Sequence, residues 1–173
     1  MSTPNLWLKF IFSGEQRVNS TSVFNPERVA IEAGREPQVR LDLRSDGKTP
    51  RIREGDILYI VAYAEDNAGV KSVRIVAKGE LETTMPNPSN PQVTEGYFKT
   101  GSFEYLNAPI VDCIDLKGLW DALGNTAFPN SNANTLEAVY AQKYYVGITP
   151  QAREWIDTHF RDNNNMSYHS TVV

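Results

Sequence analysis

The residues best suited to chemistry are few and scattered along the chain. His159 and His169 lie near its end, and neither belongs to a His-x-x-x-His or Cys-x-x-Cys arrangement of zinc ligands. Asp112 and Asp115 could form an acid–base pair, but their opposite strand parity would point them to opposite faces. A Gly-x-Ser-x-Gly elbow, a P-loop and a dinucleotide fingerprint are all absent. We therefore predict that the protein is not an enzyme.

The single cysteine, Cys113, excludes an intramolecular disulfide. It stands in the segment "APIVDCIDL", which has the character of a strand, where cysteine behaves as a small hydrophobe. We expect a buried, inert thiol rather than a nucleophile.

Two turn-like segments, residues 66–69 and 121–125, carry side chains that could act as oxygen ligands of calcium. This would require both turns to lie at one end of the fold, and most such turns serve only the backbone. We predict no cofactor, and the one metal hypothesis is a structural calcium ion at Asp66, Asn67, Asp121 and Asn125.

A basic segment runs from Arg35 to Arg53, where six Lys or Arg residues stand against three acids. Arg40 and Arg44 share the outward face of one alternating strand, so a solvated strand face is the first interpretation. A nucleic-acid contact is the alternative, and the formal net charge of −4 disfavours it.

Aromatic side chains are the second candidate for binding. Tyr59 and Tyr63 lie on one face of the segment 57–64, which is apolar on both faces and must be covered on both. We expect the face of Ile57, Tyr59, Val61 and Tyr63 to be covered by the chain's own ends or by a second copy. The other aromatic residues of this set are Trp120, Tyr140, Tyr144, Tyr145 and Trp155.

These side chains must be positioned by strands, because alternation with a period of two dominates the chain. Strands are predicted at residues 6–12, 37–44, 57–64, 70–78, 97–99, 103–105, 109–116 and 138–148. Gly69 should adopt positive φ in the turn after residue 64. We also expect Leu58, Ile60, Val73 and Ile75 to be buried on one inner face.

Two segments do not alternate. Residues 82–96 contain Pro86, Pro88 and Pro91, which predicts a long exposed loop. Thr149 and Pro150 have the character of an N-cap and a first helical residue, followed by a helix to about residue 160.

The segment "PQVRLDL…IREGDILYIVAYAEDNAGVKSVRIVAKG" resembles bacterial immunoglobulin-like β-sandwich modules, and "DALGNTA" at 121–127 resembles their closing segment. The resemblance covers about residues 37–128. It implies a mainly β protein, an Ig-like antiparallel β-sandwich with an added N-terminal strand and a C-terminal helix. We expect one domain over residues 1–160 and a flexible tail over 161–173.

A second resemblance is to PUA-like barrels, which bind RNA or modified bases. It is carried by a Trp near the N-terminus, the strand that begins after Gly-Asp, and "KYYVGITPQAREWI" as a strand followed by a capped helix. The strand order distinguishes these folds, because a closed mixed barrel and a two-layer sandwich have incompatible topologies.

The function predicted first is a non-enzymatic binding or assembly module with a protein partner or self-association; the alternative is a PUA-like domain for nucleic acid or a modified base. The predicted binding residues are Tyr59, Tyr63, Arg40, Arg44, Trp120 and Tyr144. The chain shows neither a secretory signal nor a run long enough to span a membrane, so we expect a soluble protein, cytosolic or processed.

Overall fold

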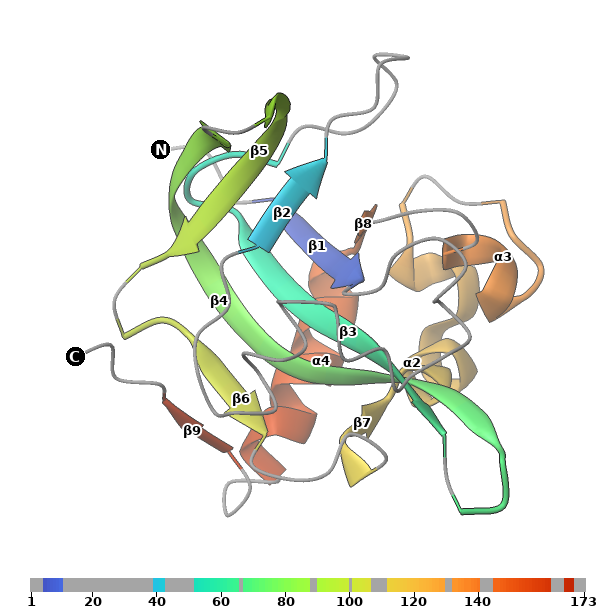
Figure 1. Cartoon of the computed structure of the whole chain (residues 1–173). Coiled ribbons are helices and arrows are strands. Elements are labelled where there is room, and N and C mark those ends of the chain that lie inside the picture. The colour runs from blue at the N-terminus through green and yellow to red at the C-terminus, as the bar shows by residue number, and fades with distance from the viewer. Residues whose placement is uncertain are drawn as a thin grey trace.

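A computed structural model describes residues 5–10, 39–42, 52–65, 67–87, 90–99, 101–106, 112–129, 132–140, 145–162 and 167–169. The described strands form one nine-stranded sheet with the order β2-β5-β4-β3-β1-β8, and β6, β7 and β9 lie off this path (Figure 1). The elements are β1 (Leu6–Phe10), β2 (Val39–Asp42), β3 (Ile57–Glu65), β4 (Lys71–Asn87), β5 (Asn90–Phe98), β6 (Glu104–Leu106), β7 (Ile114–Asp115), α2 (Leu116–Leu123), η3 (Gly124–Ala127), α3 (Leu136–Tyr140), β8 (Tyr145–Gly147), α4 (Pro150–Asp162) and β9 (Ser167–His169).

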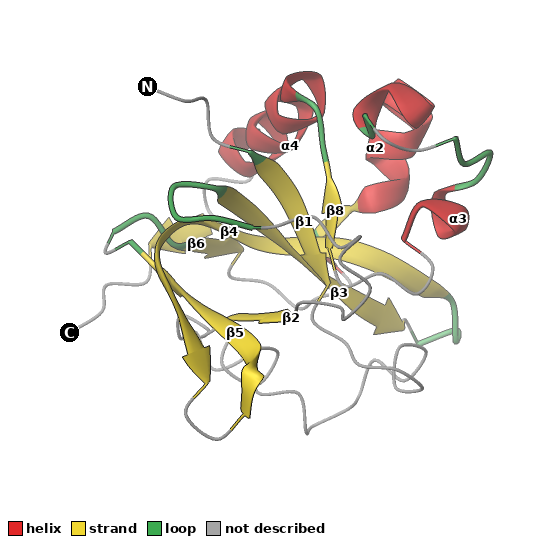
Figure 2. Ribbon diagram, turned by 90° about the horizontal axis from the view of Figure 1, so that it is seen from above, coloured by secondary structure: helices red, strands yellow, loops and turns green. Residues whose placement is uncertain are grey.

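The sheet is mixed and strongly curled. β1 pairs with β3 in parallel, whereas β3 with β4 and β4 with β5 are antiparallel. The long strand β4 bends along its length, pairing with β3 through its first half and with β5 through its second. Viewed from above, α2, α3 and α4 lie together on one side of the central strands β1, β3 and β8 (Figure 2). The part of the sheet that holds β2 and β5 curls round to the other side of these strands.

The protein is therefore mainly sheet, with a C-terminal helix, as predicted. The added N-terminal strand β1 is parallel to β3, and the described strands form one curled sheet, so a two-layer sandwich is not shown by the part of the chain that the structure describes. An added N-terminal strand is confirmed over Leu6–Phe10. Beyond residue 160, the end of α4 and the strand β9, which pairs with β6, are described.

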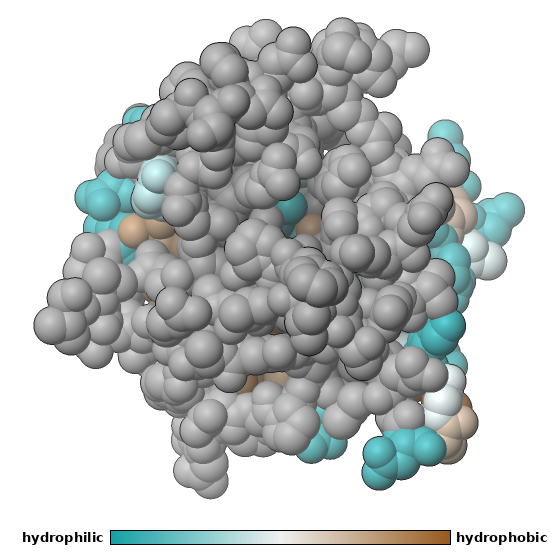
Figure 3. Space-filling model, in the orientation of Figure 1, coloured by the Kyte–Doolittle hydropathy of each residue, from teal (hydrophilic) through white to brown (hydrophobic). Residues whose placement is uncertain are grey.

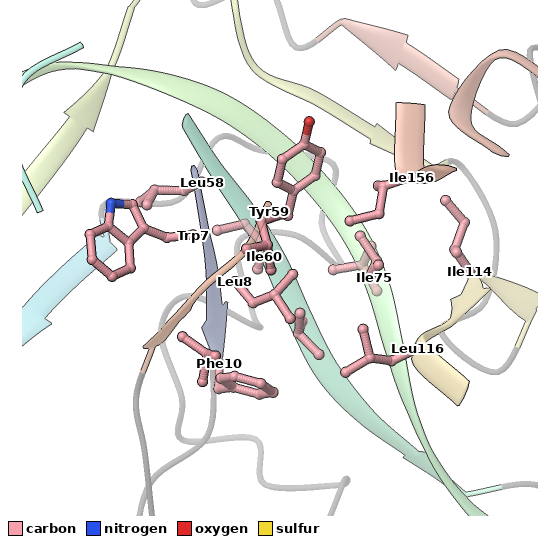
Figure 4. Close-up of a cluster of buried hydrophobic side chains, with 14 of the residues drawn as sticks. Trp7, Leu8, Phe10, Leu58, Tyr59, Ile60, Ile75, Ile114, Leu116 and Ile156 are labelled. Carbon is pink, nitrogen blue, oxygen red and sulfur yellow. The ribbon is translucent and has the colours of Figure 1, made fainter. Parts of the chain in front are cut away.

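The four residues expected in the core are buried: Leu58, Ile60 and Ile75 are fully enclosed and Val73 is 6% exposed. They do not share one face, however. The β3–β4 register shifts between Ile60 and Val61, so Ile60 lies opposite Ala77 while Val61 lies opposite Ile75. Figure 4 shows Trp7 and Leu58 on one side of the strands, and Ile75, Ile156 and Leu116 on the other.

The helices cover the tyrosine face of β3. Tyr59 is 1% exposed and Val61 is fully buried, and Ile57 and Tyr63 pack against the same core. The Tyr59 hydroxyl donates a hydrogen bond of 2.8 Å to Asp157 of α4. This confirms that the face is covered, and over Tyr59 the cover comes from the chain's own C-terminal helix.

The entry to β3 is organised around a buried carboxylate. Asp56 is 4% exposed, and its side chain accepts hydrogen bonds from the Asn5 and Arg53 backbone amides and from the Trp7 indole, at 2.9–3.1 Å. Gly55 has a φ of 89° and donates its amide to Leu81 of β4. The Gly-Asp pair therefore joins the start of β3 to both β1 and β4.

One strand prediction, one turn prediction and one loop prediction are wrong. Residues 82–87 continue β4 and residues 90–96 lie in β5. Pro86 is tolerated because this half of β4 is hydrogen-bonded to β5 alone in the described pairings. Residues 138–148 hold the end of α3 and the short strand β8 instead of one long strand. Of the strand predicted at 109–116, residues 109–111 lie outside the described residues, Ile114–Asp115 form the short strand β7, and Leu116 begins α2. The turn predicted at 121–125 is helical, in α2 and η3.

The C-terminal helix begins as its sequence predicts. Thr149 precedes Pro150, and its hydroxyl accepts a hydrogen bond from the Ala152 amide at 3.3 Å. Ala152, Ile156 and Phe160 form its buried face.

Gly69 has a φ of 79°, as expected for the turn between β3 and β4. We expect Gly69→Val to lower the free energy of unfolding by about 1–3 kcal/mol, because a β-branched residue is strained at positive φ. Urea unfolding would measure the loss. Gly69→Asn is the matched control and should cost less, because asparagine tolerates this conformation; equal losses for both variants would contradict the backbone explanation.

Candidate functional site

A groove of about 990 Å³ lies where the β3–β4 hairpin meets α2 and the start of α3. The β3–β4 hairpin contributes Tyr63 and residues 70–74, and α2 contributes Lys117, Trp120 and Asp121. Residues 134–137, which lead into α3, complete this side of the groove. In Figure 3 hydrophilic and hydrophobic colours lie side by side at the end of this hairpin, at the lower right. We name this feature the Tyr63–Trp120 groove.

The groove brings together two of the predicted binding residues. Tyr63 lies near the end of β3, opposite Val73 of β4. Trp120 lies in the middle of α2, and its ring centroid is 6.3 Å from that of Phe128. Both side chains are half-buried against the core, so each has a fixed base and an accessible edge at the groove.

The helix α2 presents one face to the groove. Lys117, Trp120 and Asp121 are spaced three and four residues apart, which places them on the same side of a helix. Asp115 caps the helix by accepting a 3.0 Å hydrogen bond from the Lys117 amide. The buried residues Leu116 and Leu119 hold the opposite side of α2 in the core.

Arg74 is held rigidly at the strand side of the groove. Its Nε donates to the Ser72 hydroxyl and its Nη1 to the Cys113 carbonyl, both at 3.0 Å. Its Nη2 lies 3.6 Å from the Asp115 carboxylate. The guanidinium is therefore oriented by three different groups before any ligand arrives.

Cys113, beneath Arg74, is buried as predicted. Burial raises the pKa of its thiol to about 12, although the nearby Arg74 opposes the shift. The thiol is therefore protonated at neutral pH, in keeping with an inert residue.

The remaining predicted residues lie elsewhere. Tyr59 is in the core beneath α4, where burial and then the Asp157 carboxylate raise the pKa of its hydroxyl, which stays a protonated donor. Asp157 also accepts a 3.1 Å bond from Lys78 and one of 3.4 Å from Arg153. This cluster joins α4 to β3 and β4, and we assign it a structural role.

Arg40 lies in β2 opposite Glu95, and its side chain is outside the described atoms. Arg44, Tyr144 and Asp66 also fall outside the described residues. The basic strand face therefore stays a prediction.

The calcium hypothesis gains no support. Asn67 is exposed in the hairpin turn, whereas Asp121 is in α2 and Asn125 in η3. Among the residues that the structure describes, no three His, Cys, Asp or Glu side chains form a metal-binding group. Over the same residues, no helix combines the length and apolar character of a membrane span.

Sequence reasoning missed Arg74 as a groove residue, and it missed the contribution of Thr135, Leu136 and Glu137. Arg74 lies in the strand predicted at 70–78 but was not named as a candidate, and most of α3 falls in the strand predicted at 138–148. The sequence carried one signal, because Thr135 is of a residue type favoured at the N-cap of a helix. In the structure the Thr135 hydroxyl has this role and accepts a 3.2 Å hydrogen bond from the Ala138 amide.

Comparisons with known proteins give no family for this chain. A scan against protein-family models finds no match, and a search of curated proteins finds none.

Proposed function

We propose that the protein is a non-enzymatic binding module that receives a segment of a partner protein in the Tyr63–Trp120 groove. The observation that carries the proposal is the convergence of Tyr63 and Trp120, from a strand and a helix far apart in sequence, on one groove. Its volume of about 990 Å³ and its mixture of aromatic and polar groups are typical of a ligand site. Val70, 60% exposed, adds apolar surface to its lining.

Charge favours a protein segment over a nucleic acid. The groove is lined by three cations, Lys71, Arg74 and Lys117, and by four acids, Asp112, Asp115, Asp121 and Glu137. A site that follows a phosphate backbone requires an excess of positive charge, whereas peptides carry both signs. The net charge of −4 acts in the same direction.

The groove also replaces the tyrosine face as the proposed contact surface. Self-association through Ile57, Tyr59, Val61 and Tyr63 would need that face to be open, and the chain's own helices cover it. Of these four residues, Tyr63 alone also lines the groove.

A second candidate is a PUA-like domain that binds nucleic acid or a modified base. It is favoured by the single curled mixed sheet. It is also favoured because the segments that carry the resemblance, which are the N-terminal Trp, the strand after Gly-Asp and the strand before the capped helix, are neighbours in the sheet. Trp7 donates its indole hydrogen bond to Asp56, and β1 pairs with β8, which is followed by the capped helix α4. The Ig-like interpretation stays a proposal for the same segment, with no second layer among the described strands.

The proposal predicts that Tyr63→Ala combined with Trp120→Ala weakens binding of selected peptides at least about tenfold, since aromatic anchors dominate protein interfaces. Peptides would be enriched from a random displayed library on the wild-type protein, and their dissociation constants would be measured by fluorescence anisotropy. Tyr97→Ala is the matched control, because Tyr97 is an exposed aromatic residue outside the groove lining.

Equal binding by the double variant and the wild type would overturn the groove as the site. The second candidate is tested with labelled single-stranded RNA and DNA at low and moderate salt. Salt-sensitive binding of an oligonucleotide that depends on Tyr63 and Trp120, with no peptide enriched, would replace the first proposal by the second.

A further inference from the structure

The charged residues of the groove are divided between its elements. The cations come from the start of β4, with Lys71 and Arg74, and from the first turn of α2, with Lys117. Two of the acids come from the following turn of α2 and from the first turn of α3, with Asp121 and Glu137. We call the cations on β4 and the first turn of α2 the basic part of the groove, and the two acids on the next turn of α2 and on α3 its acidic part; the two parts meet on α2, where Lys117 and Asp121 are one turn apart.

The other two acids do not cancel the basic part. Asp115 is already engaged, by the Arg74 guanidinium at 3.6 Å and by the Lys117 amide at 3.0 Å. Asp112 is exposed next to Cys113. Three cations stand against these two acids, which leaves an excess of one positive charge near β4.

Arg74 is suited to receive an anionic group. A guanidinium has five N–H donors, and the contacts to Ser72, Cys113 and Asp115 use three of them. The remaining two belong to a side chain that is already oriented, so a carboxylate can bind with little further loss of side-chain freedom.

Resting on the function proposed above, we propose that the groove selects a bipolar peptide segment. An acidic side chain of the segment lies against Arg74, Lys71 and Lys117, and a basic side chain lies against Asp121 and Glu137. An apolar or aromatic side chain between them packs on Tyr63 and Trp120. The order of charges in the partner, and not its net charge, decides the fit.

Three displayed peptide pools with the same randomised centre test this. One pool has glutamates at one end and lysines at the other, the second has lysines at both ends, and the third has glutamates at both ends. We expect the wild type to retain the bipolar pool about tenfold better than the other two, because each uniform pool places one end beside like charges.

Charge-reversal variants provide the decisive comparison, and all four altered positions are exposed. Asp121→Lys with Glu137→Lys should shift the preference to the glutamate pool. Lys71→Glu with Lys117→Glu should shift it to the lysine pool. Asp121→Asn with Glu137→Gln should reduce the preference without reversing it, and circular dichroism would confirm that each variant folds.

The possible results distinguish a failure of the charge selectivity inferred here from a failure of the proposed peptide-binding function. If all variants rank the pools alike, while Tyr63→Ala with Trp120→Ala abolishes retention, the groove binds peptides without reading their charge and the inference is wrong. If no pool is retained better by the wild type than by the double alanine variant, the proposed function fails and the inference fails with it.

Discussion

Replacing Ile60 by alanine should lower the free energy of unfolding by about 2–5 kcal/mol, the range for a large aliphatic side chain removed from a closed core. Ile60 is fully buried in β3, opposite Ala77 of β4. It also lies beside the β-bulge, where the pairing with β4 shifts by one residue. The backbone there is held by pairing on both sides of β3, so it cannot easily close around the cavity.

Chemical denaturation with urea would measure this loss from the midpoint and slope of the transition. Val70→Ala is the matched control, since Val70 is 60% exposed next to the hairpin turn and its truncation should change stability by less than about 0.5 kcal/mol. A loss below about 1 kcal/mol for Ile60→Ala would show that Ile60 is not enclosed as the structure places it.

Alternation predicted the central strands well because it reports burial directly. The segment 57–64 is apolar on both faces, and both faces are indeed covered, by helices on one side and by the curl of the sheet on the other. The bulge could not be predicted, because Val76 fits the alternation of either register. This one residue moves Val73 and Ile75 to the face of Tyr63 and Val61.

The helix α2 could have been predicted, since its signals are local. Asp115 is an N-cap, Leu116, Leu119 and Leu123 recur at helical spacing, and Gly124 ends the helix with a φ of 56°. The interpretation of 121–125 as a turn obscured this pattern. The groove then could not be predicted, because a third of its lining comes from α2 and α3.

The parallel pairing of β1 with β3 has no signal in a single sequence. Some 46 residues separate Phe10 from Ile57, and their placement decides which strands become neighbours. The alternating residues of β1 would suit either direction of pairing. The distinction between a sandwich and a curled sheet thus depended on tertiary packing, and the alternation of apolar and polar residues gives no information about it.

Asp56→Ala should cost about 3–5 kcal/mol, because it leaves three donors at the entry to β3 without their acceptor. The Asp56 carboxylate is buried, and it binds the amides of Asn5 and Arg53 and the indole of Trp7. The loss is larger than that of an ordinary hydrogen bond, since the buried Trp7 indole, once without a partner, also retains its desolvation cost. Asp56→Asn, with one carbonyl oxygen left to accept, should be intermediate.

A double-mutant cycle with Trp7→Phe measures how much of the stability lost in Asp56→Ala comes from the hydrogen bond of the Trp7 indole. Phenylalanine keeps much of the apolar packing of Trp7 against Tyr145 and removes the N–H that Asp56 accepts at 3.0 Å. Asp56→Ala should therefore cost about 1–2 kcal/mol less in the Trp7→Phe background than in the wild type, because one fewer donor is stranded. Strict additivity of the two substitutions would mean that Asp56 stabilises the protein through the backbone amides alone. The Trp7 side chain would then contribute to stability only through its apolar packing.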